Sequence, residues 1–379
     1  MSSVINTNVM SLDAQRNLSM SQNSLATSMQ RLSSGLRINS AKDDAAGLAI
    51  SQRMTAQING LDQATRNAND GISLAQTAEG ALNEVTNNLQ RIRELAVQSA
   101  NGSNSATDRA AMNTEAQQLM AEVNRVAQQT QYNGVNLLDG SFANQSFQVG
   151  ANFGQTISIN SIVNANASSL GSYSSASVTG VAATTLTAIT AGDVQINGVS
   201  IGAVAAAGSA TERASQLRDA INAVSDQTGV FAVNDTNNSI TLNSSAAAGI
   251  TVALAGTGTT ATTGLTAATT AASTQTGFAG LDISTAAGAQ TALLQMDGAL
   301  NAVNTARGDL GAYQNRFQSV VNSLSTTSEN LQAARSRITD ADFAQETANM
   351  TRAQILQQAG TAMVAQANSA PQGVLKLLQ

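Results

Sequence analysis

Histidine, cysteine and tryptophan are absent from the chain, and proline occurs once. Without imidazole or thiol groups, the chain cannot build a Ser-His-Asp or Cys-His catalytic site, a His- or Cys-ligated metal site, or a disulfide. Only carboxylates, lysine, tyrosine and hydroxyls are left for catalysis, and these serve few enzyme classes. We therefore expect a protein that is not an enzyme and that needs no metal or cofactor.

Charged residues are also scarce, at 11% of the 379 residues, and the formal net charge is -6. Lys and Arg are not clustered anywhere, which disfavours binding to nucleic acid or to an anionic membrane, since phosphate affinity comes from grouped cations. No segment has the composition of a transmembrane helix. The first ten residues lack the basic start and apolar core of a secretory signal peptide. We expect no membrane insertion, and either a cytosolic protein or export without a cleaved signal.

Apolar residues at heptad spacing predict two long helices, one in each half of the chain. Steps of three and four residues from Leu293 to Leu331 meet nine apolar side chains in twelve positions. A matching line of apolar side chains along one helix face, which we call a seam, runs from Ile58 to Ala96. Each of the two segments would span roughly 58 Å at about 1.5 Å per residue. Their equal lengths predict that the two helices pack against each other. A shorter seam from Met112 to Val126 predicts a third helix.

Three segments have the spacing of a capping box, in which a hydroxyl and a carboxylate satisfy free backbone N–H groups at the start of a helix. They are Ser40–Asp43, Ser105–Asp108 and Thr339–Asp342. We expect helices to begin at these points.

Near both ends of the chain, the seams contain few large apolar side chains. Leu25 to Leu36 and Leu356 to Leu377 follow a heptad pattern, but their neighbours are Gly, Ala, Ser, Asn and Gln. Such helices bury too little apolar surface to offset their conformational entropy. We predict that both ends are disordered in the monomer and fold on contact with other subunits.

The region between the helical parts has the signals of turns and strands. Asn133-Gly134 and Asn197-Gly198 are each preceded and followed by strand-forming residues, which is the strongest short hairpin signal. A short helix through Leu217 and Ile221 and three further strand patterns follow. We expect a small α+β module bounded by Ala/Thr-rich linkers at 165–190 and 255–277. The fold class predicted for the chain is mainly α, with a long antiparallel coiled coil or bundle formed by both ends, a β-hairpin and this central module.

Several of these segments resemble bacterial flagellin. Ser33 to Leu48 and Leu89 to Gln98 match its N-terminal signature, and Ser336 to Ala344, Arg352 to Gly360 and Ala370 to Leu378 match its C-terminal one. The likeness covers about 1–165 and 285–379. The middle resembles, more loosely, the strand–Asn-Gly–strand–helix insert of flagellin and hook outer domains.

The resemblance implies a division into three domains. Residues 1–45 and 335–379 would form a terminal coiled coil that lines the filament core, and 46–165 and 285–334 a helical rod with a β-hairpin. Residues 166–284 would form a variable outer domain exposed on the surface.

The resemblance also implies the function and the partners. A flagellin is exported unfolded and polymerises into the extracellular flagellar filament, a helical homopolymer that drives swimming. Its other partners are the export apparatus, a flagellin chaperone, and the cap and hook-junction proteins.

The resemblance also implies that the chain is a ligand of innate immune flagellin receptors. The positions that match the family's contacts with the animal Toll-like receptor are Gln90, Arg91, Leu95 and Glu115. Judged from the residues alone, Arg91 and its charged neighbours Arg93 and Glu94 would be intrahelical pairs or solvated groups, and Leu95 lies beside the helix seam. A structural role for Leu95 therefore competes with recognition.

Three alternatives follow from the same features. A hook–filament junction protein shares flagellin-like ends, but both terminal signatures are fully present here. A flagellin with a metalloprotease insert needs histidines, which the chain lacks. A chemoreceptor-like coiled coil needs a membrane span.

Overall fold

The computed structural model of the chain describes residues 7–235, 237–245 and 248–376. These residues fall into two compact units. Within the described residues, the first unit comprises 7–68, 148–156 and 319–376. The second comprises 69–147 and 157–318, apart from residues 236, 246 and 247. The outermost residues of the predicted terminal domain, 1–6 and 377–379, lie outside the described residues.

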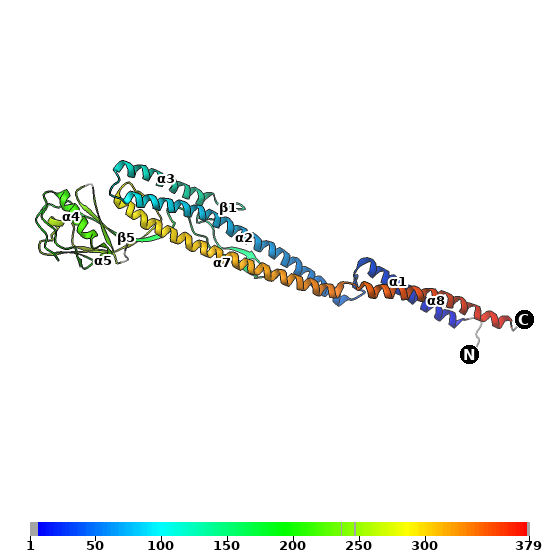
Figure 1. Cartoon of the computed structure of the whole chain (residues 1–379). Coiled ribbons are helices and arrows are strands. Elements are labelled where there is room, and N and C mark those ends of the chain that lie inside the picture. Colours follow the sequence, from blue (N-terminus) through cyan, green and yellow to red (C-terminus); the bar gives the residue numbers. More distant parts are fainter. Residues whose placement is uncertain (1–6, 236, 246–247, 377–379) are drawn as a thin grey trace. The chain divides into compact units, whose positions relative to one another are not determined.

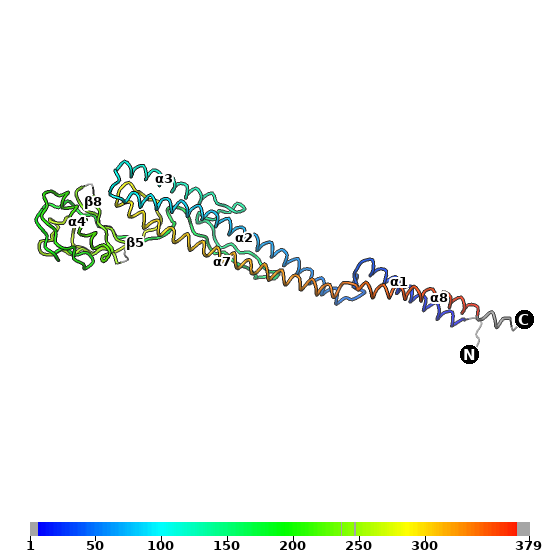
Figure 2. The backbone as a smooth tube through the Cα atoms, viewed as in Figure 1, coloured from blue at the N-terminus to red at the C-terminus, as the bar shows by residue number. Residues whose placement is uncertain are grey.

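In the first unit, helices from the two ends of the chain lie side by side (Figures 1 and 2). They are α1 (Val9–Ser34) and α8 (Phe343–Lys376). Asn8 Nδ2 donates to the carbonyl oxygen of Ala367 at 2.8 Å, whereas Arg31 lies 3.9 Å from Glu346. Since residue numbers fall along α8 as they rise along α1, the pair is antiparallel.

The turn after α1 is joined to the end of the long helix α7 (Ala286–Thr339). Gly35 ends α1 with a φ of 72°, a left-handed conformation that glycine adopts without strain. Leu36 then forms an antiparallel bridge with Asp340, and the backbone N–H of Arg37 donates to the carbonyl of Thr339 at 2.6 Å.

Only one of the three predicted capping boxes starts a helix. Ser105 and Asp108 cap α3 (Ala106–Gln129) reciprocally, which confirms that prediction. The other two predictions are wrong. The hydrogen bonds between Ser40 and Asp43 close a turn that precedes α2 (Ala45–Ala100), and at the start of that helix Asp44 accepts the N–H of Gly47. At the start of α8, Asp342 accepts the N–H of Ala344, and Thr339 takes no part in the cap. In both places an aspartate nearer the helix satisfies the free N–H groups.

The long helices α2 and α7 run antiparallel within each unit. In the second unit Arg93 Nε lies 2.7 Å from Asp297 Oδ1, and Gln314 Nε2 donates to Glu79 Oε2 at 2.8 Å. In the first unit Ser328 Oγ donates to Asp62 Oδ1 at 3.3 Å. The predicted pairing of the two helices is therefore confirmed.

The predicted seams face inward. All positions of the α2 seam except Ile72 are buried, and no α7 seam position is fully exposed. The ten α2 seam positions are Ile58, Leu61, Ala68, Ile72, Ala75, Leu82, Val85, Leu89, Ile92 and Ala96. α3 lies beside α2 (Figure 1) and buries Met112, Ala116 and Val123 of its own seam.

Two hairpins follow α3. Strands β1 (Gln131–Tyr132) and β2 (Val135–Asn136) are joined by Asn133 and Gly134, both with positive φ, as the Asn-Gly signal predicts. Strands β3 (Gln145–Gln148) and β4 (Thr156–Ile159) form the second hairpin.

The central module of the second unit contains two antiparallel four-stranded sheets, in the orders β11-β10-β6-β7 and β12-β5-β9-β8. A core shared by both sheets includes Leu217 and Ile221 of α4 (Ala210–Asn222). The strands are β5 (Ser172–Thr179), β6 (Val194–Ile196), β7 (Val199–Ser200), β8 (Val230–Asn234), β9 (Ile240–Ser244), β10 (Ile250–Leu254), β11 (Ala268–Thr270) and β12 (Ser273–Thr276), with short helices α5 (Ser225–Thr228) and α6 (Thr260–Thr263).

The Ala/Thr-rich segments predicted as linkers are part of these sheets, which corrects the sequence prediction. β5 lies within 165–190 and pairs with both β12 and β9, and β11 and β12 lie within 255–277. Their backbone ladders need no apolar alternation, and every side chain of β12 is exposed. The fold class is nevertheless as predicted: mainly α, with paired helices from both ends, a hairpin and a small α+β module.

Candidate functional site

The helices α1 and α8 expose an unusual number of large apolar side chains. Each of the following is at least 50% exposed, and together we call them the terminal apolar surface: Val9, Met10, Leu12, Met20, Met29, Phe343, Ile355, Leu356 and Met363. Scattered exposed apolar residues are normal, but a concentration on one helix pair indicates a surface that another molecule covers.

The contact between α1 and α8, in contrast, is made by small and polar groups. Ser11 Oγ donates to Asn368 Oδ1 at 2.7 Å, and Gly360 faces Leu18. In the described part of α8 the buried apolar residues are Ala353 and Ala367, and α1 buries Ser11 and Ser28. The pair therefore gains little hydrophobic stabilisation from its own contact.

A groove of about 760 Å³ runs between the two helices and is part of the same surface. Met20 and Leu356 give it apolar walls, and Arg31, Glu346 and Arg352 give it charge. Glu346 is 7% exposed, and Arg31 Nε is buried with no hydrogen-bond partner among the described residues. The groove thus offers both apolar surface and an unused donor.

The second candidate site is a charged patch where α2 and α3 lie side by side. Arg91 Nε donates to Glu115 Oε1 at 3.0 Å, and Arg91 Nη1 donates to Glu94 Oε2 at 3.1 Å. Both hydrogen bonds raise the pKa of the Arg91 guanidinium above its usual value, and the bond to Glu94 has the larger effect. The side chains of Arg91 and Glu115 remain 49% and 46% exposed. The patch is therefore an accessible ion pair held between two helices.

The other two predicted residues differ in accessibility. Gln90 is exposed beside Arg91, whereas Leu95 is only 2% exposed. The structure thus brings Arg91 and Glu115 together and places Leu95 in the core, as the competing structural role requires. Arg93 pairs across to Asp297 of α7 rather than within its own helix.

Other kinds of site are not supported in the described part of the chain. Its residues contain no group of three or more Asp or Glu placed to hold a metal ion. Among the helices that the structure describes, none has the length and apolarity to cross a membrane.

Comparison with known proteins identifies the family. Residues 5–143 match the bacterial flagellin N-terminal helical region, 293–378 match the bacterial flagellin C-terminal helical region, and 193–246 match the flagellin hook IN motif. This last match confirms that the central module resembles an insert found in flagellin and hook proteins.

Curated relatives agree with these matches. The chain is 41% identical to B-type flagellin of Pseudomonas aeruginosa and 42% identical to polar flagellin C of Vibrio parahaemolyticus, with 100% of each chain covered in both cases. FliC from Burkholderia pseudomallei is 31% identical, with a TM-score of 0.40, and covers 65% of this chain and 99% of its own. Flagellar hook associated protein-3 from Legionella pneumophila is 16% identical, with a TM-score of 0.46, over 76% of this chain and 98% of its own.

The flagellin relatives match the chain over its full length, including the central module. This coverage supports a filament subunit better than the hook-junction alternative. The chain belongs to the bacterial flagellin family and is a structural subunit of the extracellular flagellar filament, not an enzyme.

Proposed function

We propose that this flagellin is exported unfolded and that its two ends fold together only against neighbouring subunits. The observation that carries this proposal is the terminal apolar surface, which the α1–α8 pair leaves exposed. In the filament these side chains would pack between copies and line the core. The partners before assembly would be the export apparatus and a flagellin chaperone, and at the growing tip the cap and hook-junction proteins.

We further propose the three-domain division, with 1–45 and 335–379 as the core lining, 46–165 and 285–334 as the rod, and 166–284 as the outer domain. The chain enters and leaves the central module at one point, because the N–H of Gly277 donates to the carbonyl of Gly171 at 3.0 Å. An insert with adjacent ends can be replaced by a short turn without displacing the helices on either side.

Removal of the central module tests this division. A chain in which two glycines replace residues 172–276 should still extend filament fragments, because the long helices and the terminal apolar surface remain intact. Electron microscopy of fragments before and after incubation with the purified monomer measures the extension, and the full-length chain is the control. A deleted chain that is folded but does not extend the fragments would contradict the assignment of 166–284 as an outer domain.

We also propose that the monomer is a ligand of the animal Toll-like receptor through Gln90, Arg91, Leu95 and Glu115. Three of these residues are exposed on adjacent helices, and Arg91 and Glu115 present opposite charges in one patch. Interface hot spots are enriched in arginine, which supports Arg91 as the main contact. Leu95 would act by supporting the helix surface beneath the patch, since it is 2% exposed.

Arg91→Ala should lower receptor activation at least about tenfold, equivalent to about 1.4 kcal/mol. Thermal melting should be unchanged, because an exposed arginine contributes little to folding. The measurement is a dose–response curve of receptor activation by purified monomers.

Arg125→Ala is the matched control. Arg125 is an exposed arginine of α3 that is paired with Glu122 in its own helix and lies outside the patch. Its activity should equal that of the unmodified chain. Equal activity of the Arg91→Ala monomer would remove the site assignment and leave the filament role intact.

A further inference from the structure

Phe153 is fully exposed at the tip of the β3–β4 hairpin, where it protrudes from the protein. It has the highest exposed fraction of the large apolar residues in the described part of the chain. A phenylalanine side chain in water is unfavourable by about 1.5–3 kcal/mol relative to a buried one. Its position on an otherwise uncharged loop therefore calls for an explanation that the functions above do not give.

The loop holds Phe153 in a fixed place. Gln148 Nε2 donates to the carbonyl oxygens of Gly150 and Asn152 at 2.8 and 2.6 Å. Gln155 Oε1 in turn accepts the N–H of Asn152 at 3.0 Å. These side-chain bonds hold the backbone on both sides of the tip, so little backbone conformational entropy is left to lose if Phe153 binds another molecule.

The base of the loop is fixed to α2. Asn67 Nδ2 donates to the carbonyl of Gln148 at 2.9 Å. Ala151 packs so closely on Gly60 that a Cβ at Gly60 would lie 2.9 Å from the Ala151 Cβ. The hairpin tip is thus a rigid, apolar projection from the helical rod.

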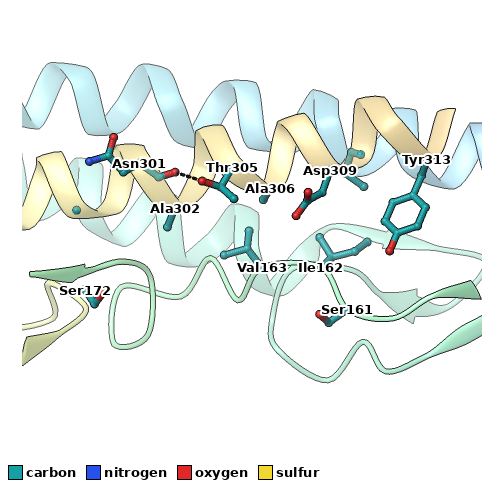
Figure 3. A pocket seen from close by; sticks show the side chains of 12 residues that line it. Ser161, Ile162, Val163, Ser172, Asn301, Ala302, Thr305, Ala306, Asp309 and Tyr313 are labelled. Carbon is teal, nitrogen blue, oxygen red and sulfur yellow. Dashed lines mark hydrogen bonds between the residues drawn. The ribbon is translucent and has the colours of Figure 1, made fainter. Parts of the chain in front are cut away.

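A groove of about 460 Å³ runs along α7 in the second unit (Figure 3). Ala302 and Ala306 of α7 form one wall, Ile162 and Val163 face them, and Tyr313 lies at one end. A cavity of about 150 Å³ lined by apolar groups is enough for a benzene ring, so this groove has room for a phenyl ring and part of the loop that carries it.

We infer that Phe153 of one subunit inserts into the α7 groove of a neighbouring subunit in the filament. The inference rests on the chain's role as a filament subunit, which makes a second copy the partner that each rod meets at high density. The methyl-rich walls and the Tyr313 ring suit an aromatic side chain. Residues 148–156 carry no charge, so the incoming loop brings no ion into the contact. The charged side chain that lines the groove is Asp309, and it lies toward the Tyr313 end.

The absence of tryptophan from the chain provides a direct test. In a Phe153→Trp variant the single indole reports its own surroundings, and its emission should move to shorter wavelength when monomers extend filament fragments. Phe231→Trp is the matched control, because Phe231 is a partly exposed phenylalanine of β8 in the central module; its emission should not move. If the Phe153→Trp variant forms filaments and its emission stays that of an exposed indole, the inference is overturned while the filament role stands.

The absence of cysteine identifies the receiving surface in the same way. A Phe153→Cys, Thr305→Cys chain should give ladders of linked subunits when its filaments are mildly oxidised, because Thr305 lines the groove. Phe153→Cys with Asn304→Cys is the control, since Asn304 is the exposed neighbour that does not line it. Equal linking of both pairs, or of neither, would overturn the assignment of the groove.

Phe153→Ala should raise the monomer concentration needed for filament growth about tenfold or more, as expected for an apolar anchor in an interface. Thermal melting of the monomer should not change, since the ring has no contacts to lose there. Unchanged filament growth would also count against the inference.

Discussion

A chain cut to residues 41–339 should stay folded and lose the ability to extend filament fragments. The cut removes α1, α8 and with them the whole terminal apolar surface, but leaves the α2–α7 seam intact. Burial of only two of those side chains in the filament contributes about 3–6 kcal/mol. Since about 1.4 kcal/mol is a factor of ten, the concentration needed for growth rises at least a hundredfold.

Sedimentation of fragments incubated with the cut chain measures the growth, and circular dichroism establishes that the helices α2, α3 and α7 persist. A chain that lacks only the central module is the control, because it is also shortened but keeps both terminal helices. Filament growth by the folded 41–339 chain would show that the terminal helices are not needed for assembly.

The isolated full-length monomer should be trimmed by protease at both ends, to a core near residues 41–339. The reason is the small apolar burial between α1 and α8, which does not offset the entropy of ordering both helices. Subunits within a filament should resist the same treatment. A monomer that resists protease at both ends would contradict the predicted disorder of the isolated ends.

The sequence predicted those elements in which the spacing of apolar residues matches a packing contact of the fold. The heptad steps from Leu293 to Leu331 identified the face of α7 that is turned inward. Asn133-Gly134 and Asn197-Gly198 identified two hairpin turns, because asparagine and glycine tolerate the positive φ that such turns need.

The elements that the sequence missed have no regular spacing of apolar residues. The strands β5 and β12 are rich in Ser and Thr and depend on backbone pairing, so they resemble linkers. Leu95 lies off the two-helix seam, yet it is buried, because α2 has α7 on one side and α3 on another, as the Arg93–Asp297 and Arg91–Glu115 pairs show. Phe153 follows no periodicity and was not identified from the sequence.

Close approach of α2 and α7 predicts a large effect of mutation at Phe317. Its ring is fully buried, meets Phe147 edge-on with the ring centres 5.5 Å apart, and lies against Gly71. Phe317→Ala should lower the free energy of unfolding by about 3–5 kcal/mol, because the cavity cannot be refilled between two rigid helices. Chemical unfolding followed by circular dichroism measures the loss, which should exceed that of Phe231→Ala, a substitution at a partly exposed ring.

Gly71→Ala tests the same contact from the opposite helix. A Cβ at Gly71 would lie 2.7 Å from Phe317 Cζ, so the added methyl should destabilise the folded chain by about 1–3 kcal/mol. Gly80→Ala is the matched control on α2, because nothing lies within 4 Å of a Cβ there. Alanine is the better helix former, so that substitution should stabilise the chain by about 0.5–1 kcal/mol.

The two variants should couple. In the Phe317→Ala background the ring that opposes the Gly71 methyl is gone, and the new Cβ fills part of the cavity. Gly71→Ala should then be neutral or stabilising, which gives an interaction energy of about 1–3 kcal/mol in a double-mutant cycle. Additive effects of the two substitutions would mean that Gly71 does not set the distance between α2 and α7 at Phe317, and that the helices are held apart by other contacts.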